Sequence, residues 1–430
     1  MKAVLSLRVI SAVVVGLGSA SVHAAGFQLL EQNASGIGNS YAGSAAIAEN
    51  ASTIYFNPAG MTRLKGVNVS GGVSAVRPSF KFSNTASTVP GGVDGNGGDA
   101  GSWGLIPNAY ASWEITPQWY VGLGIGAPFG LKTEYDDTWT GRYHSKMFSI
   151  ETINVNPSIA YKVNDQLSLG AGINWMRLDA EFSRAAPVVV PGLGFAGDLD
   201  ATVKMDGDAW GWNLGLLYQL TPETRIGLAY RSKVKIDLDG KTRVSNSSVR
   251  GRAAALVPPM NANADTSVEL PDTAILSVVH DLNSQWQLLA DVSWTGWSSI
   301  RSLDINNTGN PRVPSDSQDL RFRDTWRIAL GANYKLTHQW TLKGGVAWDQ
   351  SPVHKDKYRP TALPDNDRYW LSVGARYHFN ERTTLDIGYA HLFVKDTSIA
   401  NDTAAATKGI VRGDYDSDAN VLGIQVSHRF

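Results

Sequence analysis

The stretch Trp113-Glu114-Ile115-Thr116-Pro117-Gln118-Trp119 is one of six segments of this chain that share one pattern. A ring residue is followed by a spacer, an apolar residue and then Thr or Asn, and apolar residues return at every second position afterwards. Alternation of period two on both sides of a short turn is typical of a β-hairpin, so six hairpins are predicted. The other five segments are residues 161–167, 218–224, 280–286, 334–340 and 377–383.

Two more strands are expected outside the hairpins, over about residues 66–82 and 418–430. With the six hairpins they make fourteen antiparallel strands, an even count typical of a single-chain outer-membrane β-barrel. Long polar stretches separate the hairpins, and such barrels have short periplasmic turns and long outer loops. These stretches are residues 83–103, 128–148, 183–207, 241–266, 301–321, 350–366 and 395–417. A soluble β-sandwich is the alternative, but it would not need ring residues at one level beside its turns.

The composition favours a chain that touches lipid. Charged residues make up 18%, and there are 43 Gly, 14 Trp and 15 Tyr. A net charge of -1 provides no general attraction to nucleic acid. The absence of cysteine excludes disulfides, thiolate metal sites and a cysteine nucleophile. We expect no cofactor, no metal site and no nucleic-acid partner.

Residues 1–24 read as a secretory signal segment. Lys2 and Arg8 precede a short apolar stretch, and Val22 and Ala24 are the small residues of a cleavage site. A membrane anchor is the alternative, but the apolar stretch is shorter than the roughly 20 residues a span needs. The expected domains are therefore the signal segment, an N-terminal segment over residues 25–65, and a barrel over residues 66–430.

Because successive side chains of a strand alternate, the turns also assign two faces to each strand. The lipid-facing set includes Val121, Leu123, Ile226, Leu228, Leu288, Ile328, Leu330, Leu342 and Leu385. The opposite parity places charged residues inside, namely Arg225, Arg231, Lys233, Arg327, Lys343, Arg368, Arg376, Asp281, Asp291 and Asp386. A cation facing lipid costs about 2–4 kcal/mol, so wall charges inside the barrel are the default interpretation. The alternative is that Arg231, Arg327, Lys343 or Arg368 binds the carboxylate of a ligand.

The third strand, within residues 118–130, carries Gly122, Gly124 and Gly126 on its inward face. Glycine weakens a strand interior, and Pro128 removes a ladder donor. We predict that this strand bends away from its neighbour and opens a gap in the wall, through which apolar cargo leaves into the bilayer. The turn Asn57-Pro58-Ala59 is expected to pack beside the bend. A packed bend without a function is the alternative.

Residues 25–65 are rich in small side chains and do not read as a strand. A fourteen-stranded barrel is too wide for its wall side chains to fill, so this segment is a natural plug, with a short helix expected within Ser40–Asn50. Phe27, Leu29 and Leu30 form its apolar start, and we expect them to border a ligand pocket.

Several motifs, in order along the chain, resemble the FadL-type long-chain fatty acid transporters of the Gram-negative outer membrane. The N-terminal motifs are Ala25-Gly26-Phe27-Gln28-Leu29, Ser35-Gly36-Ile37-Gly38, Tyr41-Ala42-Gly43 and Asn57-Pro58-Ala59. The later ones are Gly130-Leu131 with Thr133 and Tyr135, Asn154 with Asn156-Pro157-Ser158, Tyr230-Arg231-Ser232, Arg327-Ile328-Ala329-Leu330-Gly331, Ser351-Pro352-Val353, and Pro364-Asp365 with Asp367-Arg368. The resemblance implies an all-β, 14-stranded antiparallel transmembrane barrel plugged by an N-terminal hatch. It also implies capture of a ligand in an extracellular apolar groove, a deeper pocket bordered by the hatch, and a kinked third strand as a lateral opening.

The expected function is passive uptake of long-chain fatty acids or similar hydrophobic molecules. An aromatic-hydrocarbon channel of the TodX type on the same fold and a general diffusion porin remain alternatives. An enzyme is the alternative from another class, but motifs such as Gly-x-Ser-x-Gly and His-Glu-x-x-His are absent from the sequence. Expected partners are the hydrophobic ligand, outer-membrane lipid and lipopolysaccharide, and the barrel assembly machinery, which would read the terminal Phe430. We expect a monomer.

Overall fold

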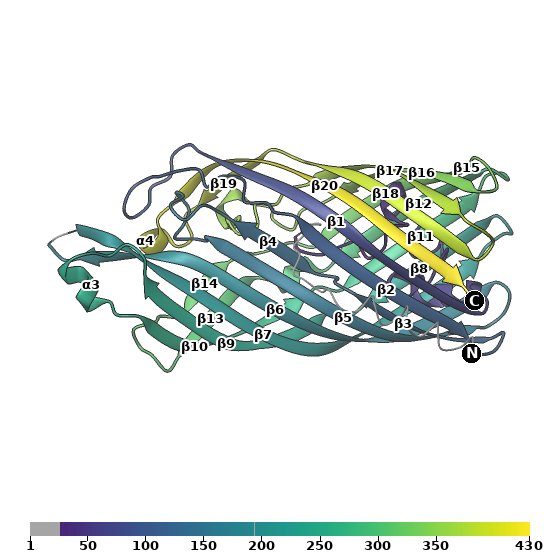
Figure 1. Cartoon of the computed structure of the whole chain (residues 1–430), viewed down its shortest axis with the longest axis horizontal. Coiled ribbons are helices and arrows are strands. Elements are labelled where there is room, and N and C mark those ends of the chain that lie inside the picture. Colours follow the sequence, from purple (N-terminus) through teal and green to yellow (C-terminus); the bar gives the residue numbers. More distant parts are fainter. Residues whose placement is uncertain (1–25, 193) are drawn as a thin grey trace.

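The computed structural model describes residues 26–192 and 194–430, so the predicted signal segment lies outside the described residues. Twenty strands form one antiparallel sheet that closes into a long barrel (Figure 1). The ring closes where β1 pairs with β20, from Asn68 opposite Arg429 to Asn84 opposite Gly413. Six of the spanning segments are divided into two strands each, so fourteen segments make the wall, as predicted.

Eight segments are single strands: β1 (Val67–Asn84), β2 (Gly104–Glu114), β5 (Met147–Lys162), β6 (Leu167–Val190), β7 (Gly194–Gln219), β16 (Trp340–Asp349), β17 (Arg368–His378) and β20 (Val411–Arg429). Six are divided: β3 (Trp119–Gly126) with β4 (Gly130–Glu134), β8 (Thr224–Arg231) with β9 (Val234–Asn246), β10 (Met260–Leu270) with β11 (Thr273–Asp281), β12 (Trp286–Thr295) with β13 (Ser302–Thr308), β14 (Asp316–Asp319) with β15 (Thr325–Lys335), and β18 (Thr383–Val394) with β19 (Thr397–Asn401). Short helices in the connections are η3 (Trp297–Ser299), η4 (Asp356–Tyr358), α3 (Arg252–Leu256) and α4 (Ala405–Lys408).

The six predicted turns join strands at one end of the barrel, which we call the turn end. In each, the Thr or Asn side chain accepts a hydrogen bond from the backbone N–H three residues later. Thr116 Oγ1 accepts from Trp119 at 3.1 Å, and Asn283 Oδ1 accepts from Trp286 at 2.8 Å. The same bond recurs at residues 164, 221, 337 and 380. The repeated Thr or Asn is therefore the residue that stabilises the turn locally.

The outer surface beside the turn end is apolar and ringed by aromatic side chains. Leu228, Ile328 and Leu330 are exposed there, as the alternation predicts. Aromatic pairs join neighbouring strands, with ring centroids 4.6 Å apart for Trp119 and Tyr161 and 4.8 Å apart for Trp340 and Tyr377. Such a band bounded by aromatic side chains suits contact with lipid. Among the described residues, no helix is both long and apolar enough to cross a bilayer.

At the opposite end, which we call the loop end, several expected loops are strands instead. β6 and β7 run through residues 183–207 and leave only residues 191–193 between them, and strands also occupy much of 241–266 and 301–321. The prediction of long loops there is wrong. The outward side chains of these stretches are polar, which made the stretches resemble loops, but their inward side chains are apolar and buried, as in a strand. Glu181 opposite Lys204 is one such outward pair. The barrel thus extends beyond its apolar band. In this extension the outer face is polar, so the hydropathy of the sequence does not reveal the strands.

The predicted inward position of Lys233 is also wrong. Its side chain is exposed and its Nζ lies 3.0 Å from Glu269. The strand breaks between Arg231 and Val234, and both of these side chains are buried. An irregular pair of residues between two strands shifts the alternation, so parity counted through the break assigns the wrong face.

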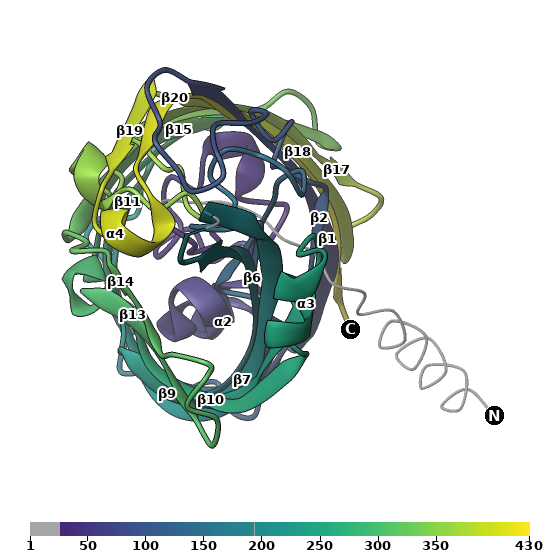
Figure 2. The same cartoon turned by 90° about the vertical axis from the view of Figure 1, so that its left-hand side faces the viewer.

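Residues 26–64, which we call the inner segment, lie inside the ring (Figure 2). They contain three short helical turns, η1 (Ile37–Asn39), α2 (Thr53–Phe56) and η2 (Pro58–Arg63). The helix expected within Ser40–Asn50 is not formed, because Ser40, Tyr41 and Ala48 have positive φ angles of 52°, 57° and 46°, which interrupt right-handed helix. The few helical residues lie on either side of that stretch.

Glycines of the wall let the inner segment approach the strands closely. A Cβ added at any of eight inward glycines outside the third spanning segment would lie under 3.0 Å from an atom of the inner segment, so a side chain there would block the close packing. These are Gly170, Gly215, Gly227, Gly331, Gly345, Gly374, Gly388 and Gly423. The high glycine content thus serves the packing of the inner segment all around the wall.

Candidate functional site

The wall is interrupted within the third spanning segment. β3 pairs with β2 as far as Ile125 opposite Ala109, and with β5 as far as Gly126 opposite Asn154. Beyond Ala127–Phe129, β4 pairs with β5, and the described residues contain no ladder between β4 and β2. The predicted bend is therefore present, and the hydrogen-bonded wall is open between the loop-end half of β2 and β4.

The start of the inner segment occupies the inside of this strand break. Leu29 N–H donates to Pro128 O at 2.8 Å, and Gly130 N–H donates to Phe27 O at 2.9 Å. Gln32 Nε2 donates to Ala127 O at 2.7 Å. The backbone groups that the third segment loses from its ladder are thus partly satisfied by residues 27–32.

The three inward glycines leave room for side chains of the inner segment and of β2. A Cβ at Gly122 would lie 2.5 Å from Met61 Sδ, and one at Gly126 would lie 2.5 Å from Gln32 Oε1. A Cβ at Gly124 would lie 3.0 Å from the Tyr110 ring. Glycine at these positions leaves space that the neighbouring side chains fill.

The Asn57-Pro58-Ala59 turn lies elsewhere, so its expected place beside the bend is wrong. Asn57 Nδ2 donates to Leu216 O on β7 at 2.9 Å, and Ala59 lies against Gly170 on β6. Asn57 also caps η2, because its side chain accepts a hydrogen bond from Ala59 N–H. The cap determines the local turn, but the wall against which the turn lies depends on the path of the whole segment.

A largely apolar cavity of about 290 Å³, the deep cavity, lies beside the strand break, and its lining also includes the charged residues Glu269, Arg301 and Asp304. Phe27 forms part of its lining and packs against Trp297 and Phe129, with ring centroids 4.8 and 6.0 Å apart. Its other apolar lining residues are Leu131, Phe148, Ile150, Leu178, Ala180, Phe182, Leu238, Val268, Ile300, Leu303, Leu320, Phe322, Pro360, Ala362 and Leu363. Such a cavity suits a slender apolar ligand, with the inner segment forming one border.

A second cavity of about 160 Å³, the mouth cavity, adjoins the deep cavity toward the loop end. The two share Phe148, Phe182 and Leu303 in their linings. Its apolar wall also carries charged groups, from Arg184 on β6, Asp316 on β14 and Lys408 on α4. These three residues come from strand extensions and a connection beyond the predicted hairpins, so the alternation of the sequence does not predict them.

The two leucines at the start of the inner segment differ in surroundings. Leu29 is buried against Gly130, within the packing around the strand break. Leu30 lines a small cavity of about 30 Å³ together with Tyr55 and Arg231. Of the three residues expected to border a ligand pocket, Phe27 is the one in the lining of the deep cavity.

The four predicted ligand-binding cations face inward, and each is engaged in holding the inner segment. Arg231 donates to Tyr55 O at 2.9 Å, and Arg327 donates to Ser40 O at 2.7 Å. Lys343 donates to Ser35 O at 2.8 Å. Arg368 pairs with Asp365, which also accepts from Gly26 N–H at 3.0 Å. In the described part of the chain, none of the four lines the deep or the mouth cavity, and binding of a ligand carboxylate by any of them stays a prediction.

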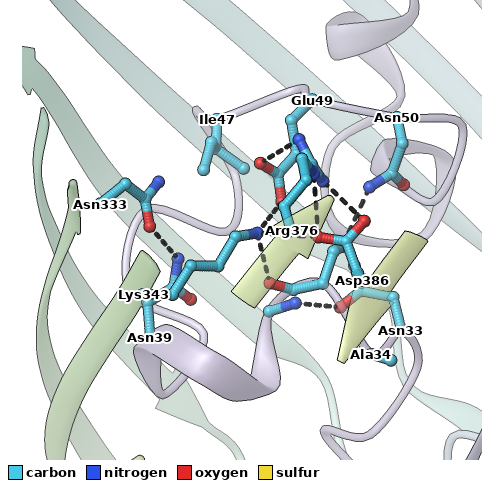
Figure 3. A network of polar contacts seen from close by, with 12 residues as sticks. Asn33, Ala34, Asn39, Ile47, Glu49, Asn50, Asn333, Lys343, Arg376 and Asp386 are labelled. Atoms are coloured by element: carbon cyan, nitrogen blue, oxygen red, sulfur yellow. Dashed lines mark hydrogen bonds and ion pairs between the residues drawn. The ribbon is translucent and has the colours of Figure 1, made fainter. Parts of the chain in front are cut away.

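Lys343 belongs to a buried charge network with Glu49, Arg376 and Asp386 (Figure 3). Arg376 donates twice to Asp386, with both N–O distances 2.9 Å. Glu49 of the inner segment accepts ion pairs from Lys343 and Arg376, each at 2.8 Å. Two acids thus balance two cations and tie the inner segment to β16, β17 and β18.

Comparisons with known proteins agree with this architecture. Residues 15–430 match the model of a family described as "Outer membrane protein transport protein (OMPP1/FadL/TodX)". The chain is 35% identical to a 47 kDa outer membrane protein of Pasteurella multocida, over 98% of this chain and 97% of that protein. It is 32% identical to a long-chain fatty acid transport protein of Escherichia coli, over 92% and 93% of the two chains. The crystal structure of a Pseudomonas aeruginosa FadL homologue superposes with a TM-score of 0.87, at 27% identity over 94% of this chain and all of that one.

Proposed function

The chain belongs to the FadL/TodX family of outer-membrane transport proteins of Gram-negative bacteria, and from this we propose that it takes up long-chain fatty acids or chemically similar hydrophobic molecules by passive transport. The observation that carries the proposal is the pair of adjoining, largely apolar cavities inside the plugged barrel, the deeper of which is bordered by Phe27. The E. coli relative named as a long-chain fatty acid transport protein supports the choice of ligand.

In the proposed route, a ligand enters at the loop end, passes from the mouth cavity to the deep cavity, and leaves sideways at the strand break. The inner segment acts as the hatch, which blocks straight passage through the ring. Burial of an acyl chain gains about 0.8 kcal/mol per methylene, so apolar cavities attract the ligand without an energy source. Exit into the bilayer avoids transfer of the chain into periplasmic water.

A direct test measures binding of oleate and toluene to the purified protein in lipid nanodiscs. We expect saturable binding of oleate, measured by quenching of intrinsic tryptophan fluorescence. Preference for toluene would favour the aromatic-hydrocarbon alternative. Steady ion conductance in planar bilayers would instead favour a porin, and binding of neither ligand would contradict the proposal.

The strand break gives a further expected outcome. In the double variant Gly124→Val/Gly126→Val, the new side chains would press on Tyr110 and Gln32 and displace the segment that occupies the break. We expect the initial rate of oleate uptake by cells to fall by roughly tenfold, which corresponds to about 1.4 kcal/mol added to the barrier and lies within the roughly 1–3 kcal/mol cost of overpacking. Equilibrium binding of oleate at the cell surface should persist.

Gly344→Val is the matched control, because a Cβ at Gly344 would meet no heavy atom within 4 Å in the described structure. It should leave uptake unchanged. Uptake by the double variant at the control rate would argue against exit at this place.

A further inference from the structure

A further interruption of the wall lies between the segment of β10 and β11 and the segment of β12 and β13. β11 pairs with β12 as far as Thr273 opposite Thr295. β10 pairs with β13 only toward the loop end, where the last pair is Asp265 opposite Asn306. Between these two pairs the described residues contain no ladder. We call this interruption the side window.

The chain leaves the wall at the side window because Trp297 turns inward. Trp297 begins η3, directly after β12, and its side chain is fully buried. Its ring packs against Phe27 of the inner segment and against Phe322, with ring centroids 4.8 and 6.2 Å apart. Burial of so large an apolar side chain stabilises the inward path although strand pairing is lost. The interruption is therefore held in place by packing in the interior.

Two side-chain hydrogen bonds cross the side window in place of a ladder. Thr266 Oγ1 donates to Asp304 O at 2.6 Å, and Ser299 Oγ donates to Glu269 O at 3.1 Å. In an antiparallel ladder, by contrast, every second residue exchanges two backbone hydrogen bonds with its partner. The two margins of the window are thus close together but weakly joined, and weakly joined segments separate at a lower cost in free energy than paired strands.

The deep cavity reaches the outer surface of the barrel through the side window. Its lining includes Val268 and Ile300, which are apolar and withdrawn from solvent, one from each margin. The lining also includes Ser267 and Arg301, which are exposed, again one from each margin. Because inward and outward residues of both margins line one cavity, a path leads from the outside of the barrel to the deep cavity without passing the mouth cavity.

The side window lies at the edge of the apolar band. Trp294 and Trp326 are opposite each other in the ladder between β12 and β15, on the turn-end side of the window, and Trp326 is exposed on the outer surface. On the window's margin, Glu269 pairs with the exposed Lys233. Outward aromatic side chains followed by charged ones mark the interface between membrane and water. The window therefore opens at the interface of the leaflet on the loop-end side, which is the outer leaflet.

We propose that the side window is an entrance through which single-chain hydrophobic molecules dissolved in the outer leaflet reach the deep cavity directly. The proposal rests on the proposed function for its ligand and adds an entrance that the path through the mouth cavity does not contain. Glu269 and Asp304 carry two negative charges around the window, and Lys233 and Arg301 carry two positive charges. Because these charges balance, the entrance selects for a slender apolar chain and not for the charge of a head group.

The first test blocks the side window from outside. The chain contains no cysteine, so Ser267→Cys provides a single thiol on the margin. Reaction with fluorescein maleimide places a bulky group over the opening, and the initial rate of oleate uptake by cells should then fall several-fold. Asn263→Cys is the matched control, because Asn263 is exposed on the same strand but pairs with Thr308 in an intact ladder. Labelling of the control should leave uptake unchanged.

The second test measures access from the membrane. Val268→Cys places a thiol on the cavity side of the window, and N-pyrenylmaleimide, which dissolves in the bilayer, should label it in protein held in lipid nanodiscs. Oleate bound in the deep cavity should slow this reaction. Ala264→Cys is the control, because Ala264 is buried on the same strand behind an intact ladder and lies outside the deep-cavity lining. It should not react.

Unchanged uptake after complete labelling of Ser267→Cys would overturn the side window as an entrance, and so would an equal loss of uptake in labelled Asn263→Cys. Absence of pyrene labelling at Val268→Cys would overturn it as well. Each of these results leaves the proposed function intact. Failure of the unchanged protein to take up oleate would instead overturn the proposed function and this entrance with it.

Discussion

Deletion of residues 27–30 is expected to abolish fatty acid uptake while the barrel still assembles. The deletion removes the Phe27 ring from the lining of the deep cavity and from its contacts with Trp297 and Phe129. It also removes the two backbone hydrogen bonds that Phe27 and Leu29 make with the strand break. The wall itself closes through pairing of β1 with β20, which the deletion does not touch.

The measurement is uptake of labelled oleate by cells, with assembly followed by heat-modifiable migration of the barrel on gels. Deletion of residues 250–253, in an exposed connection at the loop end, serves as a control of equal length and should leave uptake near normal. Phe27→Ala is a milder variant that keeps the backbone bonds and should reduce uptake only in part. Normal uptake after deletion of residues 27–30 would show that this apolar start does not border the functional pocket.

The second large effect is expected from Asp386→Ala. Asp386 is 1% exposed and accepts two hydrogen bonds from Arg376, and its Oδ1 lies 3.3 Å from Lys343 Nζ. Without Asp386, two buried cations share Glu49 alone, so one buried charge is left without compensation. Removal of one partner from such a network costs about 3–5 kcal/mol.

Urea unfolding of the protein in lipid vesicles, followed by tryptophan fluorescence, measures this loss of stability. Asp165→Ala is the control, because Asp165 lies in an exposed turn, where its pair with Lys162 contributes little. Its unfolding midpoint should match that of the unchanged protein. An unchanged midpoint for Asp386→Ala as well would mean that the network does not hold the inner segment or the wall.

The role of Phe430 in assembly stays a prediction. Its side chain is 62% exposed, and its backbone N–H donates to Val67 O at 2.9 Å. The aromatic end is therefore accessible beside the seam between β20 and β1. Binding of the assembly machinery, contact with lipopolysaccharide and the monomeric state also stay predictions.

The local pattern of the sequence determined the hairpins and the count of fourteen segments. Thr116 and Asn283 hold their turns through hydrogen bonds that span only three residues, so the information lies within each segment. Alternation likewise predicted that Arg231 and Lys343 face inward, because parity depends only on an unbroken strand. It was wrong at Lys233, where the strand is interrupted.

The tertiary structure alone decided the partners of those inward charges. Lys343 could have met a ligand, water or another wall residue, but the path of the inner segment brings Ser35 O and Glu49 to it. In the same way, Arg184, Asp316 and Lys408 are separated by long stretches of chain and meet only because the ring closes and its strands extend beyond the lipid. Hydrogen bonds in turns and strand alternation are short-range and visible in the sequence. Ion-pair partners and cavity linings depend on contacts between distant residues, which no local pattern encodes.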